Sequence, residues 1–152
     1  MDNKQIKEKL KSITDICVDS SKGYETAADQ MEDKGMETLF DRLAQQRKLF
    51  VEELNSLAIK DLGFELDTSG TIAGHFHRKW IDITSKLTDK SDEDVINDAL
   101  QGEDIALKVY NEVIQSEDVP AYINEKLKAQ RSLIEGAKKQ LHTLKEMEPE
   151  AH

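Results

Sequence analysis

Four polar residues interrupt seams of apolar side chains that otherwise recur at helical spacing. The interruptions are Ser20, Arg47, Glu103 and Gln130, and each lies near the middle of its segment. An ionised carboxylate on an apolar helix face is costly unless a cation or hydrogen-bond donors pair with it. We therefore predict that Glu103 pairs with Arg47 inside the protein.

Two tyrosines lie close to these positions along the chain. Tyr24 is one helical turn from Ser20 and Tyr110 is two turns from Glu103, at about 5.4 Å of rise per turn. We expect a polar middle layer in which Gln130, Ser20 or a tyrosine hydroxyl completes the hydrogen bonds of Glu103. We interpret this layer as a device that fixes helix register rather than as a catalytic centre.

The apolar seams define the elements that must position this layer. Residues recur at spacings of four and three, which is typical of helices that turn one face to a core. The spacing predicts long helices over about 3–32, 36–62, 91–117 and 119–146. A short turn at 33–35 makes the first two helices antiparallel neighbours. The longer connection after Gly63 is long enough to cross the bundle.

The crossover carries a further apolar stripe. A shorter helix is predicted over about 71–87, and Trp80 shares its face with other apolar residues. We expect this helix to pack on the bundle, with His77 or His75 near Trp80. The predicted fold is all-α: a four-helix bundle with one long crossover containing an extra short helix. We expect residues 1–148 to form one domain and 149–152 to form a disordered tail.

Composition restricts the class of protein. Charged residues make up 34% of the 152 residues and aromatic residues only 5%, which favours a helical bundle over a strand-rich fold. The net charge of −10 disfavours nucleic acid and anionic membranes as partners. Nine Asp and Glu against one Lys lie between Ser91 and Asp118, which we interpret as a solvated helix face.

The single cysteine and the chain start indicate an ordinary cytoplasmic protein. Cys17 has no partner for an intramolecular disulfide, and its place on an apolar seam predicts a buried, inert thiol. No apolar run of signal-peptide or membrane-spanning type is visible. We therefore expect a soluble, cytoplasmic protein.

The single crossover and the polar layer resemble the ferritin-like bundles. Di-iron sites in those bundles use one Glu from each of two helices and Glu-x-x-His from each of the others. This chain contains no Glu-x-x-His, and Arg47 places a cation where such a site would place metal. We therefore expect no metal and no other cofactor. The alternative is a divergent metal-binding or di-iron oxidoreductase-like protein that holds iron or another divalent metal through Glu25, Glu53, Glu103 and His142.

Several short motifs together resemble one family of small bacterial proteins that have a ferritin-like four-helix bundle and no assigned function. The motifs are Gly23-Tyr24 with Ala27-Ala28, Gln46-Arg47 before Phe50, His77-Arg78 with Trp80, and Gly102-Glu103-Asp104 with Ala106 and Tyr110. The resemblance implies the ferritin-like fold and a stand-alone bacterial protein. It supplies no catalytic residues.

These observations favour a non-enzymatic bundle over an enzyme. We expect a role in a stress response or as an interaction module, with a homo-oligomer as a candidate assembly. The sequence does not identify a partner.

Overall fold

The computed structural model describes residues 2–69 and 91–147. Its elements are α1 (Asn3–Gln30), α2 (Lys34–Leu57), the π-helix η1 (Ala58–Leu62), α4 (Asp92–Ser116) and α5 (Ala121–Met147). The described residues are helical with no strand, which confirms the predicted all-α class. The predicted crossover helix over 71–87, with His77 and Trp80, lies outside the described residues, as does the tail at 149–152.

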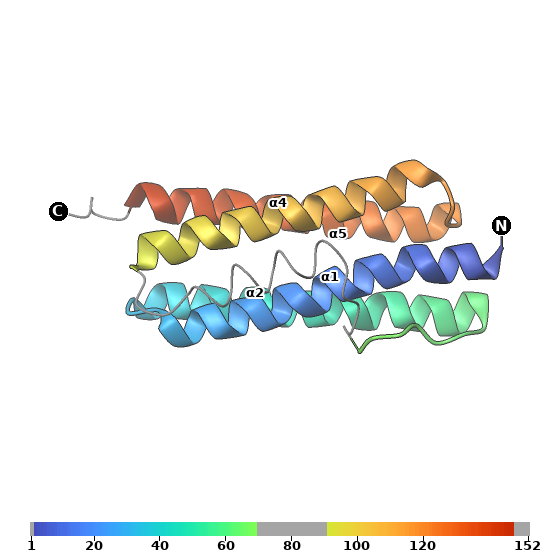
Figure 1. The fold of residues 1–152 in the computed structure, drawn as a ribbon, viewed down its shortest axis with the longest axis horizontal. Helices are drawn as coiled ribbons and strands as arrows, with labels where there is room; N and C mark the ends of the chain where they lie inside the picture. The colour runs from blue at the N-terminus through green and yellow to red at the C-terminus, as the bar shows by residue number, and fades with distance from the viewer. Residues whose placement is uncertain (1, 70–90, 148–152) are drawn as a thin grey trace.

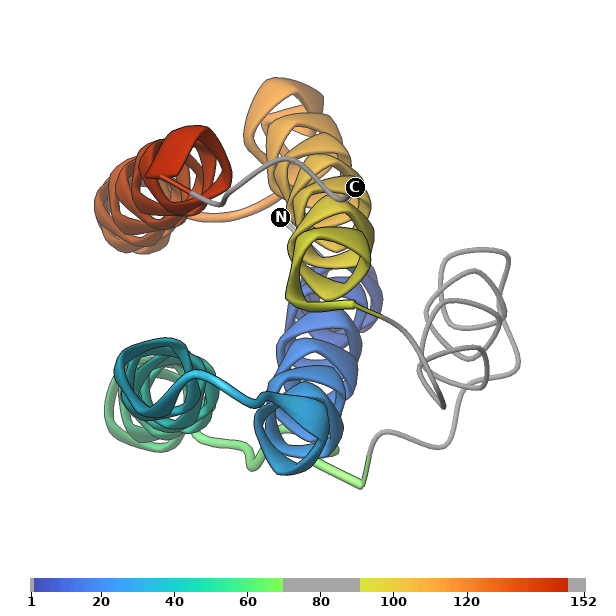
Figure 2. The ribbon, with the colours of Figure 1, turned by 90° about the vertical axis from the view of Figure 1, so that its left-hand side faces the viewer.

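The helices form two antiparallel pairs, α1 with α2 and α4 with α5, as Figure 1 shows. Helices α2 and α4 run in the same direction (Figure 1). Seen end-on in Figure 2, α1 and α4 pack against each other, and α2 and α4 occupy diagonally opposite corners of the bundle. Contacts between α2 and α5 are the sparsest around the bundle. Among the described helices, none is long and apolar enough to cross a membrane.

Side-chain caps fix where three of the helices begin. The carboxylate of Asp2 accepts a hydrogen bond from Lys4 N, that of Asp33 accepts one from Met36 N, and the hydroxyl of Ser91 accepts one from Asp94 N. Such side chains satisfy backbone donors that the first turn leaves unpaired. The turn between α1 and α2 covers residues 31–33 rather than the predicted 33–35, because α1 ends at Gln30 and Asp33 already caps α2.

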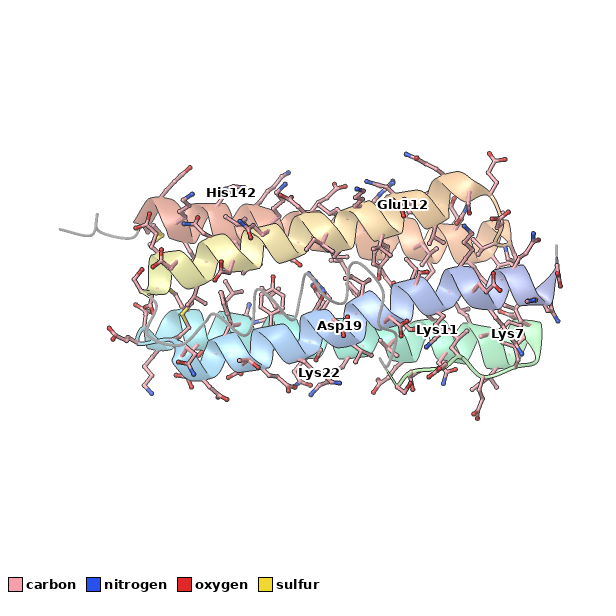
Figure 3. All side chains as sticks on the ribbon, viewed as in Figure 1. Lys7, Lys11, Asp19, Lys22, Glu112 and His142 are labelled. Atoms are coloured by element: carbon pink, nitrogen blue, oxygen red, sulfur yellow. The ribbon has the colours of Figure 1, made fainter. Side chains whose placement is uncertain are left out.

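Helix α2 widens into the π-turn η1 and ends at Gly63, as the sequence predicts. Gly63 has a φ of 79°, a left-handed conformation that costs little only for glycine. The chain then returns along α1, where the Lys7 ammonium lies 4.6 Å from the centroid of the Phe64 ring. Lys11 forms an ion pair of 2.8 Å with Asp67, and Figure 3 shows both lysines on α1.

The core consists of two apolar clusters along the bundle axis. One contains Ile13, Phe50 and Tyr110, and the other contains Tyr24 and Phe40. Buried polar residues lie between and beside these clusters, so each polar group must find its partner within the protein.

Candidate functional site

The Arg47 guanidinium binds both oxygens of the Glu103 carboxylate. The distance from Nη1 to Oε1 is 2.6 Å, and that from Nη2 to Oε2 is 2.5 Å. Both side chains are completely buried, with exposed fractions of 0%. Helices α2 and α4 lie at diagonally opposite corners of the bundle (Figure 2), so the ion pair of Arg47 on α2 with Glu103 on α4 connects the two ends of this diagonal. The predicted pairing is confirmed.

Aromatic rings surround the cation. The Arg47 Cζ lies 5.6 Å from the centroid of the Tyr24 ring and 5.9 Å from that of Phe50. Aromatic faces attract a guanidinium more strongly where water is excluded. Burial acts to lower the pKa of Arg47, but the Glu103 carboxylate outweighs it and holds that pKa above its ordinary value. Arg47 therefore stays cationic.

Tyr24 lies between this pair and the neighbouring apolar cluster. Its ring packs edge-on against Phe40, with 5.3 Å between the ring centroids. Burial, and then the negative charge of Glu103, raises the pKa of Tyr24 well above its usual value. The hydroxyl is therefore a neutral phenol and no base.

The predicted single layer is wrong in two of its members. Ser20 donates its one hydroxyl proton to the Ile16 carbonyl of its own helix, at 2.7 Å, so that proton is not available to Glu103. Gln130 lies level with Phe50, whose carbonyl accepts a hydrogen bond of 3.2 Å from Gln130 Nε2. Phe50 follows Arg47 by almost one turn of α2, so the register of α5 keeps Gln130 away from the ion pair.

Gln130 belongs instead to a second buried network, centred on Tyr110. The Tyr110 hydroxyl donates to Gln130 Oε1 at 2.7 Å and lies 3.2 Å from Cys17 Sγ. A phenol has one proton, so the thiol of Cys17 donates to the Tyr110 oxygen. Burial raises the pKa of Cys17 to about 11 and raises that of Tyr110 as well. Both groups are neutral near pH 7.

This network continues towards the surface. Gln130 Nε2 also lies 3.4 Å from Glu53 Oε1, and the other oxygen of Glu53 accepts a hydrogen bond of 2.9 Å from Lys126. Hydrogen bonds thus link α1, α4, α5 and α2 in one chain. The sequence predicted none of the Cys17, Glu53 and Lys126 contacts. Only the position of Cys17 on the same seam as Ser20 could have indicated the first.

The proposed alternative metal ligands do not come together. Each carboxylate faces its own cation, in the pairs Glu25–Lys48, Glu53–Lys126 and Glu103–Arg47. His142 is exposed on α5, near the end of the bundle (Figure 3). Within the described ranges, no group of three or more His, Cys, Asp or Glu residues is arranged to hold a metal ion. The four residues therefore do not fit one metal site.

A shallow hollow of about 400 Å³ lies beside the Glu53–Lys126 pair, between α2 and α5. The residues around it are Leu49, Glu52, Glu53, Ser56, Leu57, Lys60 and Lys126. It is the outer end of the network, and it mixes apolar walls with two acids and two lysines. The sequence did not predict it, because it depends on how α2 and α5 are placed side by side.

The chain belongs to the family described as Domain of unknown function (DUF2383), whose profile matches residues 5–116. The match covers α1, α2, η1 and α4, and so includes both members of the ion pair. Comparison with curated proteins gives no match. Comparison with solved structures gives none either.

Proposed function

We propose that this chain is a non-enzymatic, ferritin-like four-helix bundle that serves as an interaction module in the bacterial cytoplasm. The observation that carries the proposal is the Arg47–Glu103 pair, which is buried in the core and bonded through both carboxylate oxygens. A di-iron centre of the ferritin-like type needs carboxylates that are free to bind metal at this position.

The guanidinium does not fit that chemistry. A metal bound to Glu103 would have to displace two charge-assisted hydrogen bonds and leave Arg47 as an unpaired cation in the core. The same cation would repel an iron ion held nearby. The donor set present therefore favours a structural role for Glu103, and no catalytic step is assigned to it.

The second buried network, centred on Tyr110, also supports a non-enzymatic role. A thiolate is the nucleophilic form of cysteine, and a pKa of about 11 keeps Cys17 protonated near pH 7. Cys17 and Tyr110 are buried, and each is satisfied by a neighbouring side chain. Such a network stabilises one arrangement of four helices rather than presenting a reactive group.

The proposal is tested by anaerobic titration of the purified chain with iron(II), followed by exposure to oxygen. We expect no binding at micromolar affinity and no oxygen-dependent oxidation of iron. Two iron ions bound per chain with oxygen-dependent turnover would overturn the proposal. Glu103→Gln would abolish such binding if the carboxylate were a ligand, whereas Glu112→Gln, which changes an exposed acid of α4 outside the alternative ligand set, serves as the matched control.

A further inference from the structure

Large hydrophobic side chains are exposed on only one side of the described bundle. They are Leu49, Ile59, Tyr122, Leu133 and Met147, which belong to α2, η1 and α5. Leu49 and Leu133 are each 53% exposed. In the described parts of α1 and α4 no large hydrophobic residue is exposed to this extent. Exposed apolar patches of this kind commonly mark interaction sites.

Of these exposed residues, Leu49 lines the hollow between α2 and α5. Lys126 lines it as well. Tyr122 and Leu133 precede and follow Lys126 by four and seven residues, which places all three on one face of α5. We call the surface framed by Leu49, Ile59, Tyr122 and Leu133 the α2/α5 face.

The register of the two helices places these side chains towards the two ends of the face. Lys126 binds Glu53, and Tyr122 precedes Lys126 by about one turn of the antiparallel helix α5, so Tyr122 lies towards η1 and Ile59. Leu133 lies towards the other end, within one turn of the level of Leu49, because Gln130 is level with Phe50 and the two helices are antiparallel (Figure 1). The α2/α5 face therefore carries apolar side chains near both of its ends.

Charge disfavours α4 as the place where two acidic chains meet. Helix α2 with η1 carries five basic and five acidic residues, and α5 carries six basic against three acidic. Helix α4 carries one basic against seven acidic residues, in a chain whose net charge is −10. Two copies would therefore repel each other less across the surface of α2 and α5 than across α4.

The face is also large enough for a stable interface. Helix α5 has 27 residues, and α2 with η1 spans 29 residues. At 1.5 Å per residue and about 10 Å per helix, the face measures about 40 Å by about 20 Å. That corresponds to about 800 Å² on each copy, which is the usual size for a specific interface.

We propose that a second copy of this chain docks on the α2/α5 face and forms a twofold dimer. The proposal rests on the interaction-module role and names its partner. A twofold axis parallel to the helices keeps every residue at its own height. Leu49 of one copy therefore packs against Leu133 of the other, and Ile59 packs against Tyr122.

Sedimentation equilibrium of the full chain tests the dimer. We expect a dimer for the unchanged protein, and for Leu49→Glu or Leu133→Glu a Kd raised on the order of 100-fold, because each variant buries an unpaired charge at the interface. Thr26→Glu adds the same charge on the exposed surface of α1 and leaves the dimer intact. Circular dichroism confirms that the variants are folded, which their exposed positions favour.

Disulfide cross-linking between introduced cysteines tests which residues of the two copies face each other. Leu49→Cys chains mixed with Leu133→Cys chains under mild oxidant should form cross-linked heterodimers, whereas either variant alone forms few. Cys17 does not interfere, because it is buried. A monomer at concentrations up to about 100 μM, or Glu variants that dimerise like the unchanged chain, would overturn the dimer. Iron binding would overturn the proposed function instead and leave the dimer result standing.

Discussion

The ion pair of Arg47 with Glu103 carries a free-energy cost of burial. Moving both charges out of water is expensive, and the attraction between them roughly compensates only when the geometry is good. The two short hydrogen bonds of this pair meet that condition. Apolar residues of similar volume could fill the same space, so the pair favours one arrangement of α2 and α4 more than it adds stability.

A double-mutant cycle measures this balance. Arg47→Leu or Glu103→Leu alone should lower the free energy of unfolding by roughly 3–5 kcal/mol, since each leaves one charge buried without a partner. The double variant should recover much of that loss. Urea unfolding gives the coupling energy, provided that the slope with denaturant stays constant.

The exposed pair Glu25–Lys48 is the control for this cycle, since both side chains are nearly half exposed. Its coupling energy should stay below about 1 kcal/mol. A coupling energy near zero between positions 47 and 103 would contradict the ion-pair account.

Tyr110 joins the thiol of Cys17 to the amide of Gln130. Tyr110→Phe keeps the ring but leaves Gln130 Oε1 buried without its donor. The free energy of unfolding should fall by about 1–3 kcal/mol. Tyr122→Phe removes a hydroxyl from a residue that is 44% exposed, and its effect should stay within about 0.5 kcal/mol. Equal effects of the two changes, measured by thermal or urea unfolding, would show that the network contributes nothing.

Asp15 is a buried carboxylate whose partner does not fully compensate for its burial. Lys11 lies 3.3 Å from Oδ1, and Oδ2 has no hydrogen-bond partner among the residues the structure describes. Burial raises the pKa of Asp15, while Lys11 opposes the rise and the charges of Asp19 and Asp67 add to it. The folded protein therefore binds this proton more readily than the unfolded chain does.

Stability contributed by Asp15 is thus present at low pH. It is lost as pH rises from the unfolded pKa of 3.8 through the higher folded value. Asn does not titrate, so Asp15→Asn does not lose stability as the pH rises. The free energy of unfolding of this variant, relative to that of the unchanged protein, should therefore increase as the pH rises through the folded pKa of Asp15. The gain should reach at most about 1 kcal/mol by pH 7, because Lys11 offsets part of the burial cost. Urea unfolding at pH 3.5 and pH 7 measures the difference, and a larger gain at the lower pH would refute it.

At the scale of elements, apolar periodicity predicted all four long helices to within a few residues. That success has a local cause, because each seam lies within one helix. Contacts between helices depend on register, which the periodicity of one helix does not contain. Glu103 and Arg47 could be paired from charge alone, but Gln130 was assigned to the wrong level. The contact between Cys17 and Tyr110 joins residues 93 positions apart, and only the place of Cys17 on the same seam as Ser20 could have indicated it.

In the part of the chain that the structure describes, two helix ends adopt the left-handed conformation, and one of them has glycine. Gly63 has a φ of 79°, and Glu117, the C-cap of α4, has a φ of 58°. Gly63→Ala should lower the free energy of unfolding by about 1 kcal/mol. Glu117→Gly should raise it by about 1 kcal/mol, since it relieves the strain and removes an acid from a helix C-terminus.

Glu112→Gly places glycine inside α4 and is the control for these helix ends. It should destabilise by about 0.5–1 kcal/mol. Thermal unfolding of the three variants decides the matter, and a loss of stability in Glu117→Gly would contradict the strain argument.

At the scale of the molecule, the sequence predicted charge and fold class but neither the α2/α5 face nor the hollow. Composition fixes the net charge, whereas exposure is decided only when four helices are packed together. Leu49 and Leu133 resemble core residues when viewed by type alone, although each is more than half exposed. A surface of this kind becomes visible only once the neighbours of each helix are known.

The same charge distribution predicts a response to salt. The chain carries −10, and seven of its acids lie on α4. Compact packing holds like charges close together, so their repulsion destabilises the folded state. Raising the ionic strength from about 0.01 M to about 0.15 M shortens the screening length from about 30 Å to about 8 Å. The Tm should therefore rise with sodium chloride at a fixed protein concentration.

Two matched variants separate this effect from a general effect of salt. Glu112→Gln on α4 removes one acid and should raise the Tm at low salt, with a smaller further rise on adding salt. Lys128→Gln on α5 removes one base and so increases the net negative charge. It should therefore lower the Tm at low salt and give a larger rise in Tm on adding salt. Both side chains lie on the exposed surface, so packing changes little. Identical salt responses in the two variants and the unchanged protein would show that repulsion among the acids does not limit the stability of this bundle.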